Sequence, residues 1–202
     1  MKASFFLTGR FYENHSFKDL ISELKQKGHY LGPHSQNHLL YCDWNKRDSL
    51  LVTEEEFAND LRQNLEAMEK FGIAFGRRRL AEGDARETVR YFIPPFEWYN
   101  HTISNWTKKK GLQLISFSPG TKSTGDYTTP AMKNYLSSEK IWQSIVDFEM
   151  KNANGMNGFI LLLHIGTDPA RTDKFYKRLP QLISLLKQKG YHFVKVDELL
   201  KE

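Results

Sequence analysis

Short apolar runs alternate along this chain with longer segments in which apolar residues recur every three or four positions. The short runs predict strands over residues 3–7, 29–32, 91–93, 112–117, 158–163 and 191–196. The longer segments predict helices over residues 17–28, 53–71, 99–110, 138–151, 178–189 and 196–200. Strands that alternate with helices are typical of parallel pairing, so the pattern predicts a single α/β domain over residues 1–202.

Several residues mark where these elements begin and end. Thr53 and Glu56 have the spacing of a capping box at the start of a helix, and Gly28 is placed as a helix C-cap. Pro94 and Pro95 stop the strand before them. The unbroken apolar run 159–163 indicates a strand that is covered on both faces.

The composition is that of a globular protein, with 40% apolar and 13% aromatic residues and a formal net charge of +5. The basic clusters 77–79 and 108–110 are not interleaved with aromatic residues, so we interpret them as solvated faces and predict no nucleic acid partner. No apolar run approaches the length that spans a bilayer, which predicts no membrane span. The single cysteine, Cys42, excludes an internal disulfide and is best explained as a buried filler.

Two histidines four residues apart directly follow the second predicted strand. If the backbone turns into a helix there, His34 and His38 lie on one face. Two neutral imidazole nitrogens that converge make half of a zinc site, and open remaining positions would make that site catalytic. The alternative is a pair of surface histidines in a polar loop.

Unusual polar and aromatic residues also follow other predicted strands. The segment 94–99 follows one strand, Asp126 and Tyr127 come after another, and His164 ends the apolar run 158–163. In a βα barrel these strand ends share one face, which is where barrel enzymes perform their chemistry. A structural histidine bonded to a carbonyl group is the alternative for His164.

Taken in order, these segments resemble the NodB-like polysaccharide deacetylases, carbohydrate esterase family 4. Residues 34–38, His-Ser-Gln-Asn-His, are similar to the H-[ST]-x-x-H metal motif of that family, and residues 162–164 resemble its L-x-H motif. Residues 2–7 are similar to its K-A-T-F-F strand, and residues 92–96 to its R-x-P-[FY] segment. The resemblance covers nearly the whole chain and implies an irregular, TIM-like (β/α)₇ barrel from which the first strand is missing.

The resemblance also implies an activity, the hydrolysis of N- or O-linked acetyl groups on a polysaccharide with a divalent metal. Zinc is the expected ion, with cobalt, manganese and nickel as alternatives. His34 and His38 would ligate the metal, His164 would be the general acid, and Asp126 would orient His164. The substrate and the oxyanion would be contacted by Pro95, Phe96, Trp98, Tyr127 and Leu162, with the backbone N–H of Phe96 directed at the oxyanion.

Two departures from the family pattern predict weak or absent deacetylase activity. The T-F-D-D motif, which supplies the catalytic base and the third metal ligand, should precede Met1, and the sequence contains no Asp-Asp pair. This suggests a shortened form of a longer protein, and a homodimer would cover the open edge of the barrel. Ile93 stands where the family has arginine. Glu97 is the candidate replacement base, with Asp43 second; ordinary loop acids are the alternative.

Two other functions remain open at this stage. A non-catalytic relative would bind an acetylated polysaccharide or oligosaccharide through the same groove, and aromatic residues such as Trp44, Trp98 and Tyr127 suit stacking against sugar rings. A third hypothesis keeps the fold and changes the reaction to hydrolysis of another non-peptide C–N bond. The chain itself predicts no compartment, whereas the family resemblance suggests the periplasm or the cell exterior.

Overall fold

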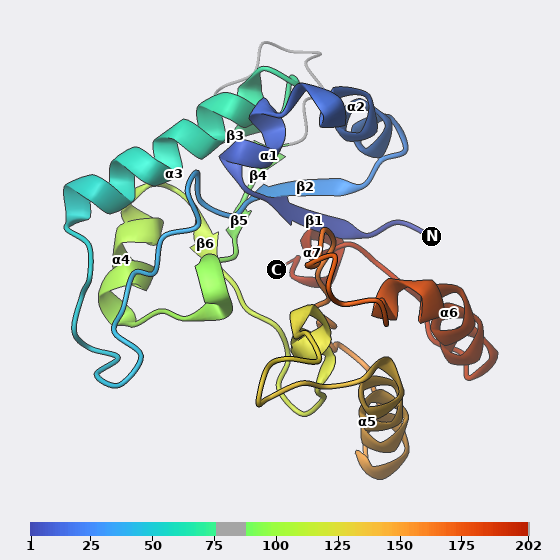
Figure 1. The fold of residues 1–202 in the computed structure, drawn as a ribbon. Helices are drawn as coiled ribbons and strands as arrows, with labels where there is room; N and C mark the ends of the chain where they lie inside the picture. Colours follow the sequence, from blue (N-terminus) through green and yellow to red (C-terminus); the bar gives the residue numbers. More distant parts are fainter. Residues whose placement is uncertain (76–87, 202) are drawn as a thin grey trace. The chain divides into compact units, whose positions relative to one another are not determined.

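The computed structural model describes residues 1–75 and 88–201, which form two compact units (Figure 1). The first unit comprises Met1–Ser116 with Phe193–Glu202, and the second comprises Phe117–His192. Each unit has helices and buried apolar residues of its own. Among the described residues, no helix combines the length and the apolar character needed to cross a membrane.

In its described residues the first unit contains three pairs of parallel strands. β1 (Ser4–Leu7) pairs with β2 (Tyr30–Pro33), β3 (Ala74–Phe75) with β4 (Thr88–Val89), and β5 (Tyr91–Phe92) with β6 (Gln113–Leu114). A parallel pair needs a crossover connection, and helices supply it for the first and third pairs. The predicted parallel pairing is therefore confirmed. The basic cluster 77–79 falls outside the described residues.

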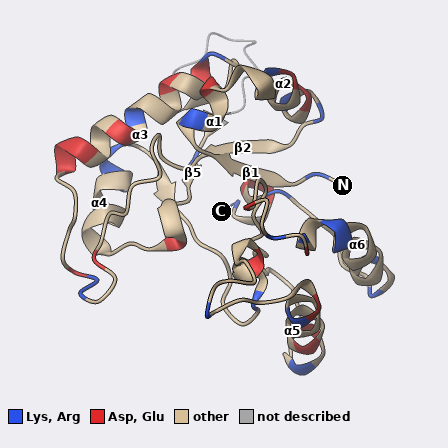
Figure 2. Ribbon diagram, viewed as in Figure 1, with Lys and Arg blue, Asp and Glu red and all other residues tan. Residues whose placement is uncertain are grey.

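Some helices of the first unit begin at a side-chain N-cap, as at Thr8, Thr53 and Asn100, and others begin without one. The helices are α1 (Gly9–Glu13), α2 (Lys18–Gln26), α3 (Glu54–Glu69), α4 (His101–Lys109) and α7 (Val196–Leu199), with short 3-10 turns η1 (His15–Phe17) and η2 (Pro95–Glu97). The predicted capping box is confirmed, because the Thr53 hydroxyl accepts from the Glu56 N–H while the Glu56 carboxylate accepts from the Thr53 N–H at 2.7 Å. The first turn of α3 contains three acidic residues, and the ribbon is red there in Figure 2.

The core of the first unit is built around aromatic side chains. Phe57 of α3 is fully buried, and its ring contacts those of Tyr41, Phe92 and Trp106 at centroid distances of 5.1, 6.3 and 5.7 Å. Cys42 is buried in the same cluster, as predicted for a filler. The basic run 108–110 is exposed, as predicted for a solvated face, and Lys109 pairs with Glu54 at 2.9 Å.

The regular structure of the second unit consists of helices joined by long non-helical segments. It contains η3 (Ser123–Tyr127), α5 (Ser138–Lys151), η4 (Phe175–Arg178) and α6 (Leu179–Gln188). The predicted strands over 158–163 and 191–196 are wrong, since neither segment is assigned as a strand. For residues 158–163 the backbone pairing stops after one hydrogen bond. The Ile160 carbonyl accepts from the Ser118 N–H at 3.0 Å, but the Ile160 N–H donates to the Ser118 hydroxyl in place of a backbone carbonyl.

Three buried tyrosines make the first unit sensitive to alkaline pH. Burial raises the pKa of Tyr30 to about 12, and it also raises the pKa of Tyr12 and of Tyr41. The pKa of each phenol is higher in the folded than in the unfolded state, so its contribution to the free energy of unfolding is fully present below pH ~10. As the pH rises from there toward 12, that contribution falls by about 1.4 kcal/mol per pH unit for each phenol. Urea unfolding between pH 8 and 11.5 measures this loss. A flat profile would contradict it.

Candidate functional site

The two histidines of the H-x-x-x-H motif lie in a loop that follows β2. Residues 34–38 are not helical, so the conditional expectation of a shared helical face is wrong. Ser35 and His38 have φ values of 72° and 57°, which a right-handed helix does not accommodate. The loop nevertheless brings the imidazole rings of His34 and His38 into edge contact, with centroids 5.0 Å apart.

A backbone carbonyl fixes the tautomer of His34. The Nδ1 atom of His34 lies 2.8 Å from the carbonyl oxygen of Ile93, a group that can only accept a hydrogen bond. Nδ1 therefore carries the proton, and Nε2 carries the lone pair that a metal ligand needs. Ile93, which replaces an expected arginine, thus contributes to the site through its main chain.

Two buried polar residues of α3 hold this loop, and sequence reasoning missed both. Asp60 is 3% exposed and Asn64 is 0% exposed. They lie one helical turn apart, on the same face as Phe57 and Leu61. A polar residue within an apolar helical stripe is a signal in the sequence that could have identified them.

The histidine pair can supply two ligands to one divalent ion. With a metal–nitrogen distance of about 2.1 Å, each imidazole centroid lies about 3.2 Å from a shared ion, and at a near-tetrahedral angle two such centroids are about 5 Å apart. The observed separation of 5.0 Å fits this arrangement. Among the described residues, no group of three or more His, Cys, Asp or Glu side chains could hold a metal. An ion bound here would complete its shell with water or substrate.

The segment after β5 places an exposed aromatic ring against the histidine pair. Pro95 is buried, whereas Phe96 is 42% exposed and its ring lies 4.5 Å from that of His38. Phe96 and Glu97 have φ values of 60° and 51°, and the Glu97 N–H donates to the Pro94 carbonyl at 3.0 Å. The carboxylate of Glu97 does not form a three-residue metal-binding group with His34 and His38. Its predicted role as a base stays a prediction.

Two tryptophans extend this aromatic surface. Trp44 is 53% exposed, and its ring lies 5.4 Å from Phe96 and 5.5 Å from Trp98. The guanidinium of Arg47 lies 4.2 Å from the ring centroid of Trp98, whose indole N–H donates to the Asp43 carbonyl at 3.1 Å. These contacts fix the orientation of the rings and leave Trp44 and Phe96 accessible.

The second unit contains a carboxylate–imidazole pair. Asp126 of η3 is 2% exposed and contacts His164 twice. One carboxylate oxygen lies 2.6 Å from Nδ1 of the His164 ring, and the other accepts from the His164 backbone N–H at 2.8 Å. This two-point contact fixes the orientation of the ring and directs Nδ1–H at the carboxylate, as an imidazole that acted as a general acid through Nε2 would require. The structure thus joins the two residues that the sequence assigned to this role.

The remaining predicted residues of the second unit lie beside this pair. The ring of Tyr127 is 45% exposed and contacts the His164 ring edge-on, with centroids 5.3 Å apart. Leu162 is half-buried and precedes His164 by two residues. The predicted site residues therefore form two groups, one in each unit.

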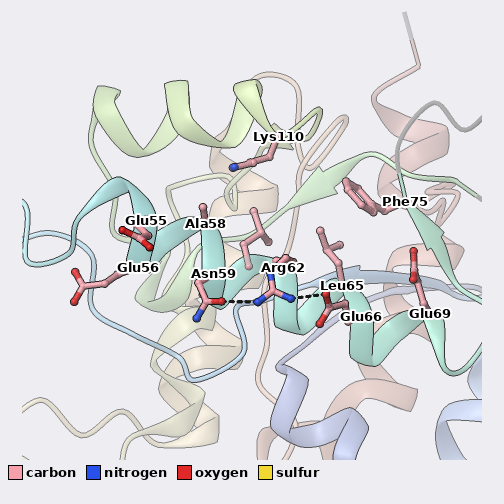
Figure 3. A pocket seen from close by; sticks show the side chains of 11 residues that line it. Glu55, Glu56, Ala58, Asn59, Arg62, Leu65, Glu66, Glu69, Phe75 and Lys110 are labelled. Carbon is pink, nitrogen blue, oxygen red and sulfur yellow. Dashed lines mark hydrogen bonds and ion pairs between the residues drawn. The ribbon is translucent and has the colours of Figure 1, made fainter.

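A separate groove of about 710 Å³ runs along α3 in the first unit (Figure 3). It is lined mainly by the exposed face of that helix, including Glu55, Arg62 and Glu66, with Phe75 and Lys110 at its border. None of the predicted site residues lines it. The groove therefore contains none of the side chains to which a catalytic, metal-binding or substrate-binding role was assigned.

The family model and the curated relative that match this chain both describe deacetylases. The family model described as polysaccharide deacetylase matches residues 1–115. Over 201 residues the chain is 26% identical to a peptidoglycan-N-acetylglucosamine deacetylase of Bacillus cereus, and the match covers 99% of this chain and 76% of that protein.

Solved structures show the same fold. A family 4 acetyl xylan esterase from Clostridium thermocellum, in complex with a cobalt ion, matches with a TM-score of 0.66 and 21% identity over 98% of this chain and 76% of its own. A carbohydrate esterase family 4 pseudoenzyme from Bacillus anthracis matches with a TM-score of 0.67 and 19% identity over 100% of this chain and 56% of its own. These likenesses confirm the predicted α/β fold class, that of the polysaccharide deacetylases.

Proposed function

The chain belongs to the polysaccharide deacetylase family, and from that premise we propose that it is a metal-dependent deacetylase-like hydrolase of low turnover. Its substrate class would be a polysaccharide or oligosaccharide with N- or O-linked acetyl groups. The observation that carries the proposal is the two-point contact between Asp126 and His164, because it prepares an imidazole for proton transfer. The contacting imidazole rings of His34 and His38 support the metal dependence.

The residues of this chain divide the hydrolysis among them. An ion held by His34 and His38 would polarise the acetyl carbonyl and lower the pKa of water. The oxygen of a water molecule would add to the carbonyl carbon while the water proton passes to a base, the role predicted for Glu97, and the backbone N–H of Phe96 would stabilise the oxyanion. The bond between the acetyl carbon and the sugar nitrogen or oxygen then breaks. His164 gives its Nε2 proton to the departing group, and Asp126 stabilises the imidazolium before that transfer.

Two features support low turnover. Ile93 replaces the arginine of the family pattern, so no cation from that position pairs with a catalytic base. The described residues contain no group of three or more His, Cys, Asp or Glu side chains that could hold a metal, and two imidazoles alone bind a divalent ion more weakly than they would with a carboxylate beside them. The Bacillus anthracis pseudoenzyme shows that this fold also occurs in a protein described as inactive.

Glycan binding without catalysis is the second candidate. It is favoured by the exposed aromatic surface formed by Trp44 and Phe96, because sugar rings stack on such faces. An acetylated glycan is the expected partner in both cases. The homodimer predicted from the sequence stays a prediction.

Acetate release and glycan binding, measured on one preparation, test the proposal. N-acetylated chito-oligosaccharide and acetylated xylan are offered with zinc or cobalt, and acetate is quantified alongside calorimetric binding. We expect binding with slow release, and loss of the release but not of the binding in His164→Ala. Binding without any release would favour the second candidate. Neither binding nor release from either substrate would contradict both.

The exposed tryptophan gives a separate prediction. Trp44→Ala is expected to lower the affinity for chito-oligosaccharide about tenfold, or about 1.4 kcal/mol, because it removes an accessible ring from the aromatic surface. Trp44→Phe keeps a ring at that place and is the matched control, expected to retain most of the affinity. Calorimetric titration measures both. Equal losses in the two variants would argue against stacking.

A further inference from the structure

Helix α3 holds the histidine loop through a buried carboxylate. Asp60 accepts hydrogen bonds from five donors, all from residues 35–41. The Gln36 N–H donates to it at 3.1 Å and the Asn37 N–H at 3.0 Å. The side-chain amide of Asn37 donates at 2.9 Å, and the Ser35 hydroxyl also donates. This set occupies both oxygens of a side chain that is 3% exposed.

The same helix reaches both histidines. Asn64 accepts from the backbone N–H of His34 at 2.8 Å, and its amide donates to the Leu7 carbonyl at 3.3 Å. At the other end of the loop, the Ser35 hydroxyl accepts from the His38 N–H at 3.0 Å while it donates to Asp60. The backbone N–H groups of four loop residues, His34, Gln36, Asn37 and His38, are therefore held by α3, either directly or through the Ser35 hydroxyl.

This network is what stabilises an otherwise unfavourable backbone. Ser35 and His38 both have φ in the left-handed region, which costs of order 1–3 kcal/mol at each non-glycine residue. Left-handed backbone of this kind persists only where the surroundings determine it, and a buried carboxylate that accepts five bonds does so. The carboxylate is also too fully engaged to serve as a base or as a ligand, since its oxygens face donors from the loop.

We propose that Asp60 is a positioning residue that sets the metal affinity of the His34–His38 pair through the Ser35 hydroxyl and the loop backbone. The inference rests on the metal-binding part of the proposed function. Residues that orient metal ligands from behind typically change affinity by about 10–100-fold when they are replaced. An amide at position 60 keeps one acceptor oxygen and turns an N–H₂ group toward the remaining donors, so the loop loses its geometry without losing either imidazole.

The test compares zinc affinity by competition with a chromophoric chelator. Asp60→Asn is expected to weaken zinc binding about 10–100-fold. Ser35→Ala, which leaves the carboxylate in place but removes the Ser35–Asp60 bond together with the connection to His38, is expected to weaken it about tenfold. Glu66→Gln on the exposed face of α3 is the matched control and should bind zinc as the parent does. Affinities are measured well below the metal-free thermal midpoint of each variant, so that a loss of folded protein is not read as a loss of affinity.

The possible outcomes separate this inference from the proposed function. Weaker zinc binding in both variants, together with faster amide exchange at residues 36–38, supports the inference. A parent that binds zinc while both variants bind it equally well overturns the inference and leaves the proposed function standing. A parent that binds no zinc overturns both. A lower midpoint in Asp60→Asn with unchanged affinity shows a purely structural carboxylate and also overturns the inference.

Discussion

The double variant His34→Ala/His38→Ala is expected to bind zinc at least about a thousandfold more weakly than the parent chain, a loss of roughly 4 kcal/mol. The two imidazoles are the predicted protein ligands, and the described residues offer no group of three or more His, Cys, Asp or Glu side chains that could take over. The Nδ1 contact of His34 with Ile93 already presents the correct nitrogen, so their removal takes away prepared donors. Metal content after dialysis and direct zinc titration measure the effect.

A matched control separates this site from general affinity for imidazoles. His15→Ala/His101→Ala also removes two histidines, and both are exposed in the first unit. This control should retain the parent affinity. Equal losses in the two double variants would show that zinc binds the surface at random, and unchanged binding in the first would remove the metal from the proposed function.

The second large effect is expected in the core. Phe57→Ala should lower the free energy of unfolding by about 3–5 kcal/mol, because it removes a fully buried ring and leaves a cavity among three aromatic neighbours. A domain of ordinary stability has about 5–15 kcal/mol in total, so this loss would remove a large share of it. Urea unfolding followed by circular dichroism measures the change.

Two further variants provide reference values for the loss in the free energy of unfolding. Phe57→Leu keeps most of the apolar volume and should cost less than half as much as the alanine. Glu55→Ala changes an exposed residue on the same helix and should alter the free energy of unfolding by less than about 0.5 kcal/mol. A loss below about 1 kcal/mol for Phe57→Ala would mean that the ring does not occupy the core position described above.

The sequence predicts the helices better than the strands, for a physical reason. The cap of α3 consists of Thr53 and Glu56, which are three residues apart, and α5 starts and ends at the residues predicted. Such signals are local. A strand exists only through its partner, and the apolar run 158–163 shows that composition alone does not supply one.

In the candidate site, too, local signals in the sequence were informative and long-range contacts were not predictable. The motifs and the family resemblance pointed to His34, His38, Asp126 and His164, and the structure brings the members of each pair into contact. The loop conformation could not be read from the motif, because Asp60, which holds it, is 25 residues away from Ser35. A local sequence pattern identifies candidate site residues, whereas the residues that orient them are brought into contact only by the tertiary structure.

The left-handed backbone of the site has a consequence for protein engineering. In the part of the chain that the structure describes, the non-glycine residues with positive φ are Ser35, His38, Phe96 and Glu97, and all of them lie in the two loops of the histidine pair. Glycine would relieve the backbone at each place but would delete a side chain that the loops use. Selection for thermal stability alone would therefore favour substitutions at these four positions. A search for a more stable variant needs to test ligand binding as well as stability.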